Sequence, residues 1–412
     1  MTPEPPAAPV SPEGTPVAPP PPPPERRRRV VRWLVAWLLG VALLTLTPGG
    51  GGPAIGVLCF PCGELGAADA VLNTGLFVPL GALLGMLGAG VGTVAAAGFG
   101  LSAAIELTQT ALPGRFPTVA DVVVNGGGAL LGLLLLRFVR AGRLTPVAVA
   151  LAAAAALVVT AGLGAGTAPA GPLYGQHTPT LGSFAVYDGA VLRAEVGGVV
   201  VRPGRLDAPE PLREALRASG PLRVEFIAGT PTDRWAPIFA VFSEAREEAV
   251  FLAARDDDLI VRFRSWAGRL HFAEPSFVLE GGLAGVQPGD VVSVEARRGR
   301  TGFCVRTEVA AACGLDPSPV EGWRLLYRDI HAPGPFPLFT GFYVAVVVGL
   351  LMVTGGVRTA AIATGGLVAL AFALSLATSA AWPEPVGLVG GALVGAVVSR
   401  LGRRWRVADT RV

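Results

Sequence analysis

The sequence predicts a multi-domain membrane protein, with an α-helical bundle of about eight transmembrane spans and an extracytoplasmic all-β jelly-roll sandwich inserted between spans 5 and 6. Three observations predict this fold class. Of the 412 residues 51% are apolar and only 15% are charged, whereas soluble domains carry about 25% charged residues. Apolar stretches near the ~20 residues that cross a bilayer recur toward both ends of the chain. A central region, 168–333, holds only short runs bounded by turn residues.

The chain begins with a proline-rich tail. Residues 1–25 end in six consecutive prolines, and such a segment buries too little apolar surface to fold, so we expect a disordered cytoplasmic tail. Arg26 to Arg29 follow it and lead into a first span that ends near Thr47. The other spans are expected at 70–88, 93–112, 120–138, 145–165, 337–355, 359–380 and 385–400, with a cytoplasmic tail at 403–412.

Arginine placement predicts the orientation of these spans. With a cytoplasmic N-terminus, the inner loops receive nearly all the arginines near span ends, and the short outer loops hold only Arg115. The positive-inside rule therefore predicts a multi-pass protein of the bacterial plasma membrane with both termini cytoplasmic and 168–333 outside. The expected domains are a four-helix unit at 26–140, a fifth span at 141–167, the insert at 168–333 and three spans at 334–402.

The insert has the pattern of an antiparallel sandwich. Cys304 and Cys313 lie nine residues apart on the predicted outer side, where disulfides persist, so we expect them to pair. Cys59 and Cys62 have CxxC spacing; a disulfide is favoured over a redox or half-zinc site because no second ligand pair accompanies them. The predicted strands are Ala190–Glu195, Leu222–Ile227, Ile238–Phe242, Ala249–Ala253, Leu259–Phe263, Val291–Ala296 and Gly322–Tyr327.

Two features of the insert leave alternatives open. Asp256, Asp257 and Asp258 stand between two strands and form either a solvated hairpin turn, which is favoured, or a calcium site. Trp235, Trp266 and Trp323 either pack in the core, which is favoured, or stack on sugars. The segments from Pro221, Ala236, Val250 and Leu259 resemble concanavalin-like (LamG-type) jelly rolls, with a "P-I-F-x-x-x-S" strand and an "L-x-V-R-x-R" strand. The resemblance implies a fold that often binds glycans, although many such domains only hold proteins together, and the strands themselves show no lectin site.

Ionisable and amide side chains gather at the outer ends of three predicted spans. They occur in pairs three or four residues apart, so each pair shares one helix face. Because a carboxylate in lipid costs about 2.5–3.5 kcal/mol or more, we expect these groups to face one another or a wet cavity. The candidate ligand pocket comprises Asp69, Asn73, Glu106, Gln109, Arg115, Asp121 and Asn125.

A purely structural role is the alternative for most of these residues. Asp69 and Asp121 precede apolar runs and could be helix N-caps. Asn73 and Asn125 could be interhelical hydrogen-bonding groups. Glu106 is harder to explain in this way, because it lies about two turns inside its span.

The same residues carry a resemblance to a known family. The sequence shows "D-x-x-x-N-x-x-x-F-x-P-x-G" from Asp69, "E-x-x-Q" from Glu106, "R-x-x-x-x-x-D-x-x-x-N" from Arg115 and "G-x-x-x-G" from Gly128. This order and spacing over about residues 30–140 resemble the VanZ family. The resemblance implies a membrane protein of the bacterial cell envelope, in a family named after a protein that gives low-level teicoplanin resistance.

The C-terminal spans repeat parts of the first ones. Phe339-Thr-Gly resembles Asn73-Thr-Gly, and the segment from Trp382 to Gly395 resembles that from Phe116 to Gly132. We expect a degenerate second copy of the three-helix unit that has lost the counterparts of Asp69, Glu106, Asp121 and Asn125.

Two functions fit the sequence. The first is a non-enzymatic envelope protein whose outward-facing pocket binds a cell-wall precursor, glycan or glycopeptide and contributes to teicoplanin-type resistance. The alternative is a membrane enzyme in which Glu106 acts as general acid/base on an outer-leaflet lipid or glycan, with Arg115 holding a phosphate or carboxylate. A transporter is less favoured, because the polar groups lie at one end. The sequence predicts the bilayer as a partner and no nucleic acid, metal or cofactor.

Overall fold

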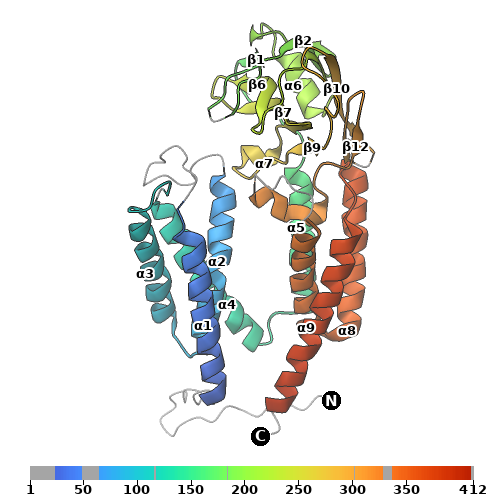
Figure 1. The fold of residues 1–412 in the computed structure, drawn as a ribbon. Coiled ribbons are helices and arrows are strands. Elements are labelled where there is room, and N and C mark those ends of the chain that lie inside the picture. Colours follow the sequence, from blue (N-terminus) through green and yellow to red (C-terminus); the bar gives the residue numbers. More distant parts are fainter. Residues whose placement is uncertain are drawn as a thin grey trace, which may run out of the picture. The chain divides into compact units, whose positions relative to one another are not determined.

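The computed structural model describes residues 24–48, 65–115, 117–182, 184–300, 302–327 and 336–409 (Figure 1). The chain divides into two compact units. The first comprises residues Met1–Phe60 and Ala70–Ala141, and the second Pro61–Asp69 and Gly142–Val412. Cys59 and Cys62, for which a disulfide is expected, lie outside the described residues, as does nearly all of the 1–25 tail.

The first unit is helical. Apolar runs end at glycine- and proline-containing turns, and α4 begins at an N-cap, Thr118, and ends with Arg137 and Arg140 in its last turn, where basic side chains favour the helix dipole. The indole of Trp37 donates a hydrogen bond to the Leu76 carbonyl (3.1 Å) and packs edge-on against Phe77, which holds α1 on α2. The helices are α1 (Pro24–Thr45), α2 (Gly66–Met86), α3 (Val91–Gln109) and α4 (Val119–Arg140).

Glycines bring α2 and α4 into close contact. A Cβ atom built on Gly132 would lie 1.9 Å from the Val78 carbonyl oxygen, and one on Gly128 would lie 2.3 Å from that of Thr74. Only glycine fits at such a distance, and close small-residue packing is how helices associate in lipid. The "G-x-x-x-G" pattern of α4 is therefore its contact with α2.

The second unit contains the remaining long helices, α5 (Pro146–Leu163), α8 (Phe336–Thr378) and α9 (Pro385–Asp409). At Gly356 (φ 80°) the helical path of α8 is interrupted, so α8 has two arms, 336–355 and 357–378. Gly355, at the bend, lies against Pro146 at the start of α5. The far ends of the two arms both contact the β-rich region, Phe339 through Trp323 and Thr378 through Arg298, so the arms fold back on each other. The arms match the predicted spans 337–355 and 359–380.

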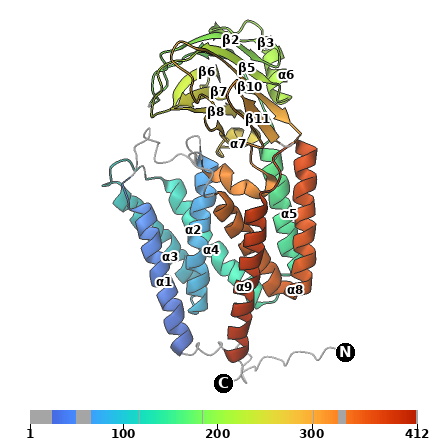
Figure 2. The ribbon, with the colours of Figure 1, turned by 45° about the vertical axis from the view of Figure 1, so that its right-hand side comes forward.

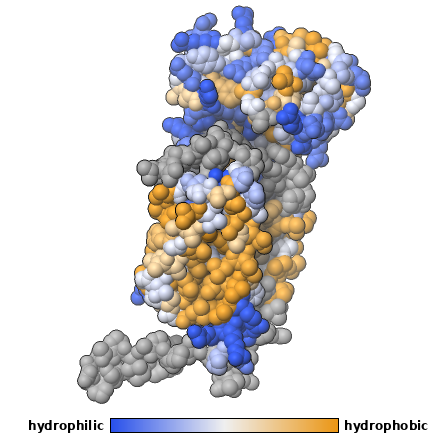
Figure 3. Space-filling view, turned by 60° about the vertical axis from the view of Figure 1, so that its left-hand side comes forward, coloured by the Kyte–Doolittle hydropathy of each residue, from blue (hydrophilic) through white to orange (hydrophobic). Residues whose placement is uncertain are grey.

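Among the residues that the structure describes, five helices are long and apolar enough to cross a membrane, namely α2 to α5 and α8. Figure 3 shows mainly apolar side chains on the helical surface in view. The structure thus has several apolar helices and a separate β-rich region (Figure 2). The count of eight crossings and their orientation remain predictions.

The β-rich region consists of two six-stranded antiparallel sheets, consistent with a β-sandwich. The first sheet, in spatial order, contains β4 (Gly204–Arg205), β1 (Leu173–His177), β6 (Ala236–Ser243), β7 (Glu248–Arg255), β8 (Asp258–Phe263) and β9 (Phe277–Leu279). The second contains β12 (Ala311–Cys313), β11 (Gly302–Arg306), β10 (Val291–Gly299), β5 (Leu222–Ile227), β2 (Ala190–Val196) and β3 (Val199–Val200). Two short helices, α6 (Glu210–Arg217) and α7 (Trp266–Arg269), lie between strands.

Alternating residues of both sheets form one core. Ile238 and Leu252 from the first sheet and Val224, Phe226 and Val294 from the second are fully or almost fully buried in it. Six of the seven predicted strands match β2, β5, β6, β7, β8 and β10.

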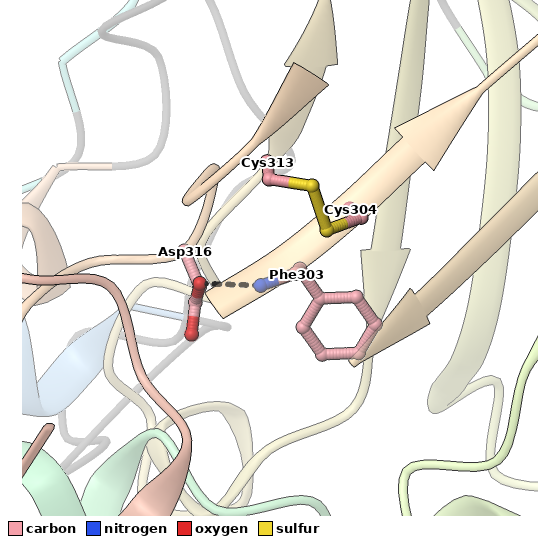
Figure 4. The surroundings of a disulfide bond; sticks show 4 residues. All are labelled: Phe303, Cys304, Cys313 and Asp316. Carbon is pink, nitrogen blue, oxygen red and sulfur yellow. Dashed lines mark hydrogen bonds between the residues drawn. A yellow bond between two sulfur atoms is a disulfide. The ribbon is translucent and has the colours of Figure 1, made fainter. Parts of the chain in front are cut away.

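A disulfide joins Cys304 on β11 to Cys313 on β12 (Figure 4). The two cysteines are directly opposite each other in the strand register. Beside them, the buried Asp316 carboxylate accepts a hydrogen bond from the Phe303 N–H (2.7 Å).

The predicted strand Gly322–Tyr327 is wrong, because Pro319–Leu326 forms a 3-10 helix, η1. Pro319 occupies its first turn, and the Glu321 carboxylate accepts a hydrogen bond from the N–H of the N-cap residue Ser318 (2.8 Å). The Ser-x-x-Glu pattern is a helix-start signal, and it outweighs the apolar character of the following residues.

Candidate functional site

Three side chains at one end of the first unit form a continuous hydrogen-bonded chain. The Asn73 amide of α2 donates to Asp121 Oδ1 of α4 at 2.6 Å. The Thr118 hydroxyl donates to Asp121 Oδ2 at 2.9 Å, and the Asp121 N–H in turn donates to that hydroxyl oxygen. Asp121 therefore accepts hydrogen bonds with both carboxylate oxygens and links two helices.

Glu106 joins this chain from α3. Its Oε2 accepts a hydrogen bond from the Thr118 N–H at 2.9 Å, and its side chain is buried. Thr118 thus contacts two carboxylates, Glu106 through its backbone and Asp121 through its hydroxyl. The four residues Asn73, Thr118, Asp121 and Glu106 are called the carboxylate network below.

Ser102 and Asn125 form a second polar contact between α3 and α4. The Asn125 amide donates to the Ser102 hydroxyl at 2.9 Å, and both side chains are buried. Asn125 Oδ1 is also buried and accepts no hydrogen bond from the described part of the chain. A buried amide oxygen without a donor costs about 1–3 kcal/mol, so this atom is an available acceptor.

Gln109 and Arg115 bind the C-terminal end of α1. The Gln109 amide donates to the Thr45 carbonyl (2.9 Å), and the Arg115 guanidinium donates to the carbonyls of Thr47 (2.9 Å) and Leu44 (3.1 Å). Across the described residues, no ion pair within 4.0 Å joins Arg115 to a carboxylate. Its contacts are those of a helix C-cap, because they satisfy carbonyls that have no partner within the helix.

Asp69 lies in the first turn of α2, one turn before Asn73 and on the same face. Asp121 is not the N-cap of α4, which is Thr118; Asp121 is the residue three positions later that completes the cap. Within the described ranges no group of three or more His, Cys, Asp or Glu side chains could hold a metal ion.

Residues 36–140, which include α2 to α4 and the whole carboxylate network, match the family described as VanZ/LLP1. The chain contains a VanZ-like domain. No curated protein and no solved structure matches the chain.

Sequence reasoning missed two members of the VanZ-like domain's polar contacts, Thr118 and Ser102. Thr118 stands three residues before Asp121, a capping-box-like spacing that predicts an N-cap hydroxyl. Ser102 lies four residues before Glu106 and therefore shares its helix face. Hydroxyls near carboxylates in an apolar helix were the available signal.

The sandwich places the other candidate residues apart from one another. Asp256 and Asp257 form the two-residue turn between β7 and β8, and Asp256 has positive φ. The guanidinium of Arg255 lies 4.6 Å from the Trp235 ring centre. Trp266 is 41% exposed, and the Trp323 indole donates to the Thr340 hydroxyl at 3.1 Å.

Proposed function

We propose that this chain is an integral protein of the bacterial cell envelope whose VanZ-like domain binds a cell-wall precursor, glycan or glycopeptide at the carboxylate network. In this proposal binding contributes to teicoplanin-type resistance by changing what the drug can reach. The family match over 36–140 supports an envelope role, and the network supports the place of binding.

The observation that carries the proposal is a cluster of hydrogen-bond acceptors inside apolar helices, to which the described residues supply few donors. Asp121 and Glu106 bring two carboxylates together, and the described donors to them are Asn73, Thr118 and no arginine. Asn125 Oδ1 adds a third acceptor. Carboxylates in such helices are expensive, so groups of this kind mark functional sites by default. A peptide or sugar ligand offers N–H and O–H donors that match them.

The proposal places both termini in the cytoplasm and the sandwich outside. The arginines of the chain support this orientation through the positive-inside rule. The disulfide between Cys304 and Cys313 supports it as well, because disulfides persist outside the cytoplasm.

We further propose that the sandwich is of the concanavalin type. Its two six-stranded antiparallel sheets and the strand sequences of β6 and β8 support this assignment. Trp266, which is 41% exposed, offers an aromatic surface for a glycan. A glycan role is supported if the protein binds wall glycan saturably, Trp266→Ala loses this binding, and the exposed-residue control Val309→Ala retains it. Equal binding by both variants contradicts a glycan role.

A second candidate is catalysis, favoured by the position of Thr118 between two carboxylates. Glu106 would then act as a general acid/base on an outer-leaflet substrate. Glu106→Gln keeps the shape and hydrogen bonding of the side chain but removes its acid/base function.

These two functions are separated by measuring teicoplanin susceptibility in a strain whose resistance depends on this protein. Wild type, Glu106→Gln, Glu106→Ala and the exposed-residue control Val123→Ala are compared at equal membrane abundance. Resistance retained in Glu106→Gln but lost in Glu106→Ala supports binding, and loss in both supports catalysis. Full resistance in both variants would contradict a role for the network.

A further inference from the structure

The C-terminal helices pack with the same register as the VanZ-like helices. Gly391 and Gly395 of α9 lie against the carbonyls of Gly341 and Ala345 in the first arm of α8; built Cβ atoms would approach those oxygens to 2.3 and 2.6 Å. In the VanZ-like domain, Gly128 and Gly132 of α4 meet Thr74 and Val78 of α2 in the same way. Both pairs are four residues apart on each helix, and the segments 127–132 and 390–395 read GGALLG and GGALVG.

This register assigns counterparts to two network residues. Counting from Gly128 and Gly391, Asp121 corresponds to Glu384; counting from Thr74 and Gly341, Asn73 corresponds to Thr340. A carboxylate is thus retained at the Asp121 position, contrary to the expectation from sequence alone. Asn125 corresponds to Leu388, so the amide acceptor is replaced by an apolar side chain.

A cavity of about 590 Å³ lies at Glu384, in the loop between α8 and α9. Its walls come from the second arm of α8, that loop, η1 and the edge strand β9 with its flanks. Most of the lining is apolar, and Trp382, which is 54% exposed, packs edge-on against Phe372 with ring centres 5.9 Å apart. An indole face on a cavity wall is suited to an apolar or cationic group.

The charges of the cavity favour a cation. Arg324, the basic residue of the lining, is paired with Glu321 at 3.5 Å. Glu280 follows β9 and is exposed, and within the described residues no ion pair neutralises it. Glu384 accepts hydrogen bonds from the N–H groups of Val386 and Gly387 at the start of α9, and no arginine pairs with it in the same ranges. The excess charge of the lining is therefore negative.

We propose that this cavity, the second copy's counterpart of the carboxylate network, binds an amphiphile that carries a primary ammonium group. The apolar body lies against Trp382 and Phe372, and the ammonium group lies between Glu280 and Glu384. The proposal does not rest on a ligand for the VanZ-like domain.

Calorimetric titration of the full chain in nanodiscs with 4-phenylbutylamine tests this site. The uncharged 4-phenylbutanol is the ligand control. We expect saturable binding of the amine that is at least tenfold tighter than that of the alcohol. The double variant Glu280→Gln/Glu384→Gln is expected to weaken amine binding at least tenfold, and Trp382→Leu several-fold.

Two control variants keep the outcome specific. Glu214→Gln changes an exposed residue on α6, and Val123→Ala changes an exposed residue of the VanZ-like domain; both should bind the amine as the wild type does. The proposal would be overturned by equal affinity for amine and alcohol or by the absence of saturable amine binding. Unchanged binding in Glu280→Gln, whose exposed side chain has no packing role, would also overturn it. So would loss of binding in Val123→Ala alone.

Discussion

Replacing Asp121 with alanine is expected to destabilise the VanZ-like domain by about 2–4 kcal/mol. The carboxylate accepts hydrogen bonds from the Asn73 amide (2.6 Å) and the Thr118 hydroxyl (2.9 Å). Interhelical hydrogen bonds in membrane proteins contribute about 0.6–2 kcal/mol each, and bonds to a charged group about 1.5–3 kcal/mol. Two bonds of about 1–2 kcal/mol each, within these ranges, give about 2–4 kcal/mol. Asp121→Asn keeps the acceptor for Asn73 and is expected to lose about half as much.

The assay is reversible unfolding of the purified full-length protein in mixed micelles of increasing denaturing-detergent content. Val123→Ala on the same helix, whose side chain is exposed, is the matched control and should change the unfolding free energy by less than ~0.5 kcal/mol. If Asp121→Ala unfolds as easily as Val123→Ala does, then the hydrogen bonds of the network do not hold α2 and α4 together, and the reasoning fails.

Three further outcomes are expected. Gly132→Ala should lower the free energy of unfolding by at least about 1–3 kcal/mol, because its Cβ would clash with the Val78 carbonyl. Gly127→Ala, whose Cβ would meet open space, should leave this free energy unchanged. Equal unfolding free energies for the two variants would contradict the close contact. Burial, and next the charge of Glu248, raise the pKa of Glu274 from 4.5 to about 7, so the fold favours the neutral acid. The contribution of Glu274 to stability should therefore be largest below pH 4.5 and fall by about 3 kcal/mol as the pH rises through 7, at 1.36 kcal/mol per pKa unit. Glu274→Gln should remove this pH dependence of the unfolding free energy. A pH profile of thermal unfolding that is the same in Glu274→Gln as in the wild type would refute the prediction. Replacing Cys304 and Cys313 by serine should destabilise the sandwich by about 2–3 kcal/mol, the loop-closure value for a nine-residue separation; an unchanged unfolding temperature would contradict this.

Much of the fold could be predicted because its signals are local. Apolar length placed the helices, and alternation placed β5 and β10. Gly322–Tyr327 was mistaken for a strand because its composition suits one, while the cap at Ser318 decides its structure. The two-residue strands β3 and β4 are too short to leave a periodic pattern.

The candidate site was predicted by residue type but not by contact. The predicted span boundaries placed Asn73, Glu106 and Asp121 at one end of their helices, and the structure joins them through Thr118. The partner of Arg115 could not be predicted, because carbonyls at the end of a helix carry no sequence signature. The counterpart of Asn73 in the proposed second copy required the glycine contacts, because the apparent match of Thr74 with Thr340 is one residue out of the packing register.

A direct binding titration tests the central proposal best. Purified full-length protein in nanodiscs would be titrated with lipid-linked wall precursor, wall-glycan fragments and teicoplanin, using wild type, Glu106→Ala, Asn125→Ala and the control Val123→Ala. We predict that wild type and Val123→Ala bind at least one ligand saturably. Binding should be lost in the folded Glu106→Ala and weakened in Asn125→Ala. Absence of binding by folded wild-type protein, or binding that neither substitution changes, would contradict a ligand site at the carboxylate network.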